Sequence, residues 1–139
     1  MIIPNLMVTD VARSIAFYRE IIGMKLAVAI DGERNILGED QADSAVFATL
    51  ELDGAQLMVQ SVASLAIELD EFTAEHRPTA SGTVYFRGVH PETLKDRVDS
   101  AIVVKGPFQQ WYGMNEIYLR DPDGYILCFG APEGPPPAG

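Results

Sequence analysis

One order of secondary structure occurs twice along this chain, and that repeat restricts the fold more than any other feature. Short alternating apolar runs predict strands, and apolar residues at helical spacing predict helices. Both halves follow the order strand, helix, strand, strand, strand, about 80 residues apart, although their residue identity is weak. The first copy covers 2–8, 11–22, 24–30, 44–52 and 55–61, and the second covers 83–89, 91–98, 101–104, 113–120 and 125–129. We therefore predict one α+β domain over 1–131, built from two βαβββ modules, 1–62 and 81–131.

Capping and turn residues support these boundaries. Asp10 can cap the first helix, and Gly23 can end it in a backbone conformation that other residues resist. Asp53-Gly54 is typical of a tight hairpin. The turn Asp121-Pro122-Asp123-Gly124 either joins the last two strands as a plain hairpin or mimics an anion-binding loop. Three further segments are predicted: a helix over 63–75, a linker over 76–82 and a mobile tail over 132–139.

Charge and composition exclude several classes of protein. The chain has 20 acidic and 10 basic residues, a net charge of −10, which argues against a nucleic-acid partner because phosphate binding needs Lys and Arg. The acidic balance either serves solubility or attracts a cationic ligand. No apolar run reaches the roughly 20 residues that span a bilayer, and no signal peptide is visible, so we expect no membrane partner and a cytoplasmic location. The single cysteine excludes an internal disulfide.

Two motifs resemble the vicinal oxygen chelate superfamily, which includes glyoxalase I, extradiol dioxygenases and bleomycin resistance proteins. "VTDVARSIAFYREIIGMKL" (8–26) resembles the opening helix motif of the family, and "YLRDPDGYILCF" (118–129) resembles its closing hairpin. With the repeated order of elements, the resemblance covers residues 1 to about 131. It implies a cup-shaped mixed sheet, the glyoxalase/bleomycin resistance fold, in which both modules wall one cavity.

The resemblance also implies where a metal would bind. Metal-binding members place one His, Glu or Gln ligand on each of four cup strands, and the matching positions here are Ile3, Gln60, Thr83 and Cys128. These residues are poor ligands for a catalytic divalent ion, which needs at least three firm donors. His76 and His90 lie outside the predicted cup strands. We therefore predict no metal, no other cofactor and no catalytic residue, and Cys128 is either a small buried hydrophobe or a nucleophile.

Strand alternation predicts which side chains line the cup, because every second residue shares a face. Trp111 is placed at the rim. Glu116 either anchors a cation or acts as a base, with a pKa raised by burial, or it pairs with Arg87 or Arg120. Phe17 and Tyr18 are either core or a ligand-stacking pair. The predicted ligand-binding residues are Met7, Met58, Gln60, Tyr85, Arg87, Trp111, Glu116, Tyr118 and Cys128.

The lining of Met, Tyr and a few polar groups favours a flat organic ligand, cationic or neutral, unless Arg87 reverses the preference. The absent ligand set makes the chain resemble the metal-free bleomycin-resistance-like branch, in which a small drug-like molecule is sequestered unchanged. The alternative is a glyoxalase- or dioxygenase-type enzyme with an unusual site of Gln60, Glu116 and Cys128. A third possibility is a lyase-like or orphan module with a closed cup that acts through partners. We expect a homodimer, because such sheets leave apolar faces and edges to cover.

Overall fold

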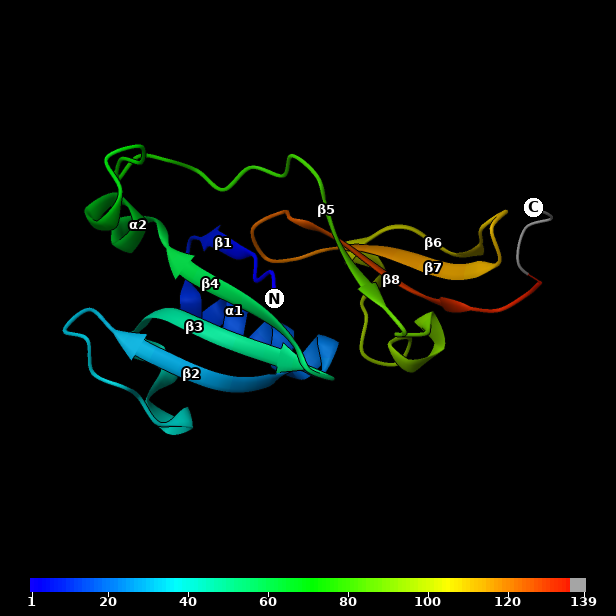
Figure 1. Cartoon of the computed structure of the whole chain (residues 1–139), viewed down its shortest axis with the longest axis horizontal. Helices are drawn as coiled ribbons and strands as arrows, with labels where there is room; N and C mark the ends of the chain where they lie inside the picture. Colours follow the sequence, from blue (N-terminus) through cyan, green and yellow to red (C-terminus); the bar gives the residue numbers. More distant parts are fainter. Residues whose placement is uncertain (136–139) are drawn as a thin grey trace. The chain divides into compact units, whose positions relative to one another are not determined.

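Two compact units make up the protein, one over Met1–Pro78 and a second that begins at Thr79. The computed structural model describes residues 1–135. Each unit is built on one four-stranded sheet that mixes parallel and antiparallel pairs (Figure 1). The predicted α+β class is therefore confirmed.

Unit 1 packs one helix against its sheet. The strands lie in the order β1-β4-β3-β2, with β1 parallel to β4 and the other pairs antiparallel. α1 lies against β3 and β4 (Figure 1), and the core includes Val8, Tyr18, Leu50, Leu57 and Val59, each at most 2% exposed. The elements are β1 (Asn5–Val8), α1 (Val11–Phe17), β2 (Lys25–Asp31), β3 (Ala45–Leu52), β4 (Ala55–Ser61) and α2 (Val62–Glu68).

The helix predicted over 11–22 is confirmed, but its winding changes along its length. Asp10 caps it by accepting a hydrogen bond from the Arg13 N–H, at 3.1 Å. After α1 the chain continues as a π-helical turn over Tyr18–Ile22. Gly23 then ends the helix at φ 90°, and its N–H donates to the Tyr18 carbonyl, as expected for a glycine in the left-handed region.

The helix predicted over 63–75 is wrong beyond its first half, since α2 ends at Glu68. The sequence that follows carries acidic side chains at 70, 71 and 75. Negative charge is unfavourable at the C-terminal end of a helix, where the unpaired carbonyls already carry partial negative charge, and like charges one turn apart repel. Turns and irregular structure cover residues 69–82 instead.

Unit 2 repeats the sheet order of unit 1 as β5-β8-β7-β6, with β5 parallel to β8. One face of this sheet carries an apolar core in which Phe86 stacks on Phe129, with ring centroids 4.5 Å apart. Leu94, Leu119 and Leu127 are completely buried in the same unit. The strands are β5 (Thr83–Arg87), β6 (Val103–Gln109), β7 (Met114–Arg120) and β8 (Ile126–Pro132).

The helix predicted over 91–98 is not formed. Only a short 3-10 turn, Pro91–Thr93, follows His90, and Asp99 caps a second one at Ser100–Ile102. A helix of eight residues is marginal in water unless an apolar face packs against the protein. Leu94 is the only large apolar side chain that this segment buries completely, so little packing favours a longer helix.

Most of β6 lies in the segment between the predicted strands 101–104 and 113–120, where no strand was expected. Gly106 and Pro107 favour a loop in sequence, because proline cannot donate to a sheet. β6 is an edge strand, and its pairing with β7 shifts register around these two residues. An edge strand with a bulge tolerates both of them.

The two predicted hairpin turns are confirmed. Asp53 and Gly54 both adopt positive φ, 50° and 85°, as a two-residue hairpin of type I′ requires. In the second turn the Asp121 carboxylate accepts hydrogen bonds from the N–H groups of Asp123 and Tyr125, both at 2.9 Å. Asp121 therefore holds its own turn together, and the plain hairpin is the correct reading.

The C-terminal end of β8 continues past the predicted strand. Beyond Pro132, the Glu133 N–H donates to the Gly113 carbonyl at 2.8 Å, and its carboxylate accepts from Asn115 at 3.0 Å and contacts His90. Of the predicted mobile tail, residues 136–139 lie outside the described part of the chain. Within residues 1–135, no helix is both long enough and apolar enough to cross a membrane.

Candidate functional site

A pocket of about 350 Å³ opens on the sheet of unit 2, on the face opposite the apolar core. Its lining residues are Tyr85, Arg87, Tyr112, Met114 and Glu116. Three of these, Tyr85, Arg87 and Glu116, are among the predicted ligand-binding residues. Tyr112 and Met114 are not among those residues.

The pairing register explains why these side chains gather. Tyr85 on β5 lies opposite Cys128 on β8, and Cys128 lies opposite Tyr118 on β7. Glu116 lies two residues before Tyr118 and opposite Gly130. Residues directly opposite each other share a face of the sheet, so the alternation seen in the sequence places all of these on the pocket side.

The centre of the site is a buried carboxylate held by two tyrosines. Glu116 has no exposed surface. Its Oε2 accepts a hydrogen bond from the Tyr85 hydroxyl at 2.5 Å, and its Oε1 accepts one from the Tyr112 hydroxyl at 2.7 Å. Hydrogen bonds to an ionised group are shorter and stronger than neutral ones, so this cluster fixes both rings at the pocket wall.

Gly130 makes room for this cluster. A Cβ atom built on Gly130 would overlap the Tyr85 hydroxyl and lie 3.1 Å from the Cγ of Glu116. The sequence did not single out Gly130, although a glycine inside a strand often marks a place where another group of the protein or a ligand lies close to the strand backbone. The side chains of β5 and β7 therefore meet over the bare backbone of β8.

The pKa of Glu116 corrects the sequence-based expectation. Burial raises the pKa of this carboxyl, but hydrogen bonds from Tyr85, Tyr112 and Gln110 together lower it below its ordinary value of 4.5. The carboxylate is therefore ionised at neutral pH. A base whose pKa is lowered in this way is a poor proton acceptor, because general bases work best with a pKa near the working pH.

The ion pair predicted for Glu116 is also wrong. Within residues 1–135, neither Arg87 nor Arg120 forms a salt bridge with it. Arg120 is exposed. Arg87 is also exposed, and its guanidinium carbon lies 5.9 Å from the centroid of the Tyr85 ring, within the range of a cation–π contact.

The tyrosines around Glu116 are expected to ionise late in an alkaline titration. Burial first, and then the Glu116 carboxylate, raise the pKa of Tyr85 and of Tyr112 well above the ordinary 10.0. Burial also raises the pKa of Tyr118. Because these pKa values are higher in the folded state, the stabilisation is complete below about pH 10 and is lost as the pH rises through the folded values.

Phenolate absorbance of the native protein tests this expectation. Of the five tyrosines, we expect these three to ionise only at a pH that also unfolds unit 2. Glu116→Gln, which removes the carboxylate charge, should bring the ionisation of Tyr85 and Tyr112 to lower pH. A native titration in which all five tyrosines ionise together near pH 10 would contradict the arrangement.

Cys128 lies beneath this cluster and is fully buried. Burial, followed by the charge of Glu116, raises the pKa of its thiol to about 11. A thiol is nucleophilic only as the thiolate, so this one is unreactive at neutral pH. Of the two interpretations, the structure supports the buried hydrophobe.

Trp111 lies beside the pocket without lining it. Its side chain is 82% exposed and meets the Tyr112 ring edge to face, with centroids 5.3 Å apart. Tyr112 itself lines the pocket, so the single tryptophan is one residue away from the site. This position makes its fluorescence a reporter for the pocket.

The other predicted ligand-binding residues, Met7, Met58 and Gln60, lie in unit 1. They share the face of the sheet opposite α1, with Met7 directly opposite Gln60. Gln60 is 6% exposed, and both the oxygen and the nitrogen of its side-chain amide form hydrogen bonds. Its Oε1 accepts from Asn5, and its Nε2 donates to Ser64 and Glu68, all at 2.9 Å. These bonds tie β1 and α2 to β4, so Gln60 has a structural role.

The residues at the four implied metal positions do not fit a divalent ion. Ile3 has no donor atom, and the Gln60 carbonyl oxygen already accepts the bond from Asn5. The Cys128 thiol would first have to lose a proton that burial holds firmly. Thr83 offers one neutral hydroxyl, and one such donor is too few for a catalytic ion. Within residues 1–135, no cluster of three or more His, Cys, Asp or Glu side chains could hold a metal.

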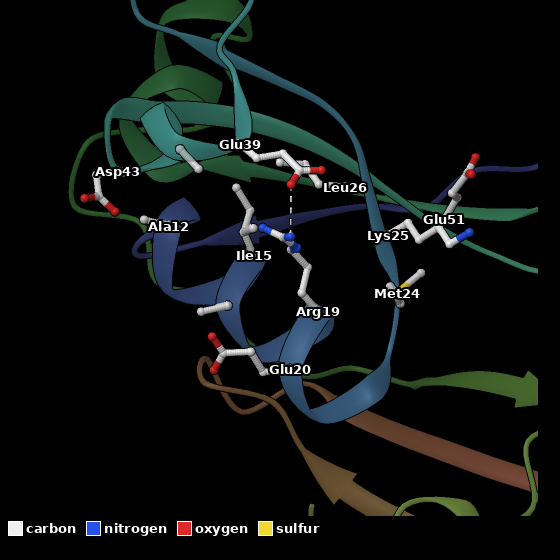
Figure 2. Close-up of a pocket in the computed structure, with 12 residues that line it drawn as sticks. Ala12, Ile15, Arg19, Glu20, Met24, Lys25, Leu26, Glu39, Asp43 and Glu51 are labelled. Atoms are coloured by element: carbon white, nitrogen blue, oxygen red, sulfur yellow. Dashed lines mark hydrogen bonds and ion pairs between the residues drawn. The ribbon is translucent and has the colours of Figure 1, made fainter.

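A larger pocket, of about 630 Å³, lies on unit 1 between α1 and the 3-10 helix Glu39–Ser44. Figure 2 shows Arg19 and Glu39 facing each other there, with an ion pair at 3.3 Å. Both side chains are substantially exposed, and an ion pair of this kind contributes little to stability. None of the predicted ligand-binding residues lines this pocket.

Comparison with known proteins identifies the family. The model of the Glyoxalase/Bleomycin resistance protein/Dioxygenase superfamily matches residues 3–129. The chain belongs to this superfamily. No curated protein sequence matches it significantly.

Three solved structures align with the chain over most of its length at low sequence identity. A protein of unknown function from Agrobacterium tumefaciens aligns with a TM-score of 0.71 and 18% identity, covering 94% of this chain and 92% of that one. TioX from Micromonospora sp. ML1 aligns with a TM-score of 0.70 and 17% identity, covering 94% and 96%. A glyoxalase/bleomycin resistance protein/dioxygenase from Nocardioides aligns with a TM-score of 0.64 and 20% identity, covering 100% and 88%. Identities this low support the fold alone.

Proposed function

We propose that the protein binds a flat organic molecule in the pocket of unit 2 and sequesters it without a metal, like members of the bleomycin-resistance-like branch. The observation that carries this proposal is the buried Glu116 carboxylate, held by Tyr85 and Tyr112 at the wall of a 350 Å³ pocket. That volume is within the range of small-molecule sites, which combine apolar walls with a few fixed polar groups. The two tyrosine rings and the Met114 thioether supply such walls.

The same geometry gives less support to an enzyme. A glyoxalase- or dioxygenase-type site would need metal ligands, a base or a nucleophile. Hydrogen bonds hold Glu116 in its ionised form, and the Cys128 thiol is protonated at neutral pH. The Gln60 amide is hydrogen-bonded to Asn5, Ser64 and Glu68 within unit 1. We therefore assign no catalytic residue and no cofactor. Ligand contacts from Met7, Met58 and Gln60 stay predictions, and so does a cytoplasmic homodimer.

Native mass spectrometry of freshly purified protein tests the proposal in one measurement. We expect a species of twice the 15.2 kDa chain mass that retains a small organic molecule. We also expect Glu116→Leu to lose that molecule, because the substitution removes the carboxylate and frees both tyrosines. Arg120→Gln, which changes an exposed charge outside the pocket, is the matched control and should retain it. A divalent metal bound at one per chain would overturn the metal-free proposal.

A further inference from the structure

We propose that the ligand of this pocket is a planar organic cation of the amidinium or guanidinium type, and that it displaces Arg87 from the face of Tyr85. This inference rests on the proposed function and names the chemical class of its ligand. It also assigns a role to Arg87, which occupies the ligand's position as a tethered competitor.

The hydrogen-bonding groups of the pocket favour a ligand that donates hydrogen bonds. A tyrosine hydroxyl has one hydrogen to donate, and Tyr85 and Tyr112 both donate theirs to Glu116. Their oxygen atoms can then only accept further hydrogen bonds. The Glu116 carboxylate is fully buried and offers a ligand only its charge, and the sulfur of Met114 is a weak acceptor. Among the five lining side chains, only Arg87 has N–H groups, so the accessible atoms of the other side chains favour a ligand that donates.

The charge at the pocket favours a cationic ligand. Glu116 holds a full negative charge beneath the two phenol rings, with no basic side chain paired to it within residues 1–135. A buried charge of this kind acts over a longer range than an exposed one, because little water screens it. The electron-rich faces of the rings add attraction for a cation. An anionic ligand would meet repulsion from Glu116 and would have Arg87 as its single side-chain donor in the pocket.

Arg87 already places a planar cation near the face of Tyr85. Its guanidinium carbon lies 5.9 Å from the Tyr85 ring centroid, so a planar cation of this size is accommodated at the ring face. The side chain is exposed, and no salt bridge within the described chain holds it there. An exposed cation–π contact contributes only about 0.5–1 kcal/mol. A free amidinium with better access to the hydroxyl oxygens can therefore replace it.

The experiment compares two matched planar probes, benzamidine as its cation and benzoate, in titrations followed by Trp111 fluorescence. In the wild-type chain we expect benzamidinium to change the fluorescence with higher affinity than benzoate. Arg87→Gln should bind benzamidinium about two- to fivefold tighter, since the competing cation–π contact is gone. Arg120→Gln removes the same charge outside the pocket and should leave the affinity unchanged. Tyr85→Leu, which removes the ring face, should weaken binding at least about fivefold.

Glu116→Gln keeps the size of the side chain and removes its charge, and we expect at least a tenfold loss of benzamidinium affinity. Thermal unfolding of each variant verifies that it is folded. If Glu116→Gln does not fold, the binding measurement on Tyr85→Leu tests the inference in its place. Benzoate binding more tightly than benzamidinium, with the affinity lost in Arg87→Gln, would overturn this inference and leave the binding function standing. If neither probe binds, both proposals fail.

Discussion

Replacing Gly130 by alanine is expected to lower the free energy of unfolding of unit 2 by about 2–4 kcal/mol and to abolish ligand binding in its pocket. The new methyl group would overlap the Tyr85 hydroxyl and crowd the Cγ of Glu116. Tyr85 would have to leave the carboxylate, and a hydrogen bond to a charged group contributes about 1.5–3 kcal/mol. The pocket would then lose the Tyr85 ring from its wall, together with the hydrogen bond to Glu116 that fixes this ring.

Urea unfolding followed by Trp111 fluorescence measures this effect, because the only tryptophan of the chain lies in unit 2. Gly82→Ala is the matched control. Nothing lies within 4 Å of a Cβ built at Gly82, so this change should be neutral or stabilise by about 0.4–1 kcal/mol. Equal stability of the two variants would show that Gly130 does not provide the space for the tyrosine–carboxylate cluster.

Tyr18→Ala is expected to destabilise unit 1 by about 3–5 kcal/mol, the cost of emptying a large buried aromatic position. Tyr18 has no exposed surface and packs edge to face against Phe17, with ring centroids 5.1 Å apart. The ring therefore belongs to the core, and the alternative reading of this pair as a ligand-stacking site is wrong for Tyr18. Tyr18→Phe retains the ring and should lose far less stability.

Circular dichroism during urea unfolding checks this second prediction, with the midpoint and the slope compared among the three proteins. The ligand affinity of Tyr18→Ala, measured under conditions in which it is folded, should match the wild type. A variant that stays as stable as the wild type but loses ligand would place Tyr18 in a binding site instead of the core.

Several parts of the fold could be read from the sequence because their causes are local. Asp10 and Gly23 bound the first helix through their own backbone preferences. The Asp53-Gly54 turn requires positive φ at both residues, a conformation these residue types adopt readily. Strand alternation placed Tyr85, Glu116 and Tyr118 on one face, because the period of two is a property of every strand.

Other elements depended on what they pack against, and there the sequence-based predictions failed. The segment 91–98 has helix-forming residues but only Leu94 to bury completely, so the protein gains little from making it a helix. No strand was expected between residues 104 and 113, yet β6 extends through Gly106 and Pro107 because an edge strand needs fewer of its hydrogen bonds. Both outcomes depend on neighbours that are remote in sequence.

The sequence by itself determined the family, the α+β class and the side of the sheet on which the candidate site lies, since repeated order, turn residues and alternation are all properties of neighbouring residues. The tertiary structure alone decided the chemistry of that site. Glu116 was expected to have a raised pKa or an arginine partner, and its pKa is lowered because two tyrosine hydroxyls point at it. Tyr85 reaches it from β5 over Gly130, and Tyr112 reaches it from the turn before β7. Which donors surround a buried charge depends on strand register and side-chain direction, and these are fixed only when the sheet has formed.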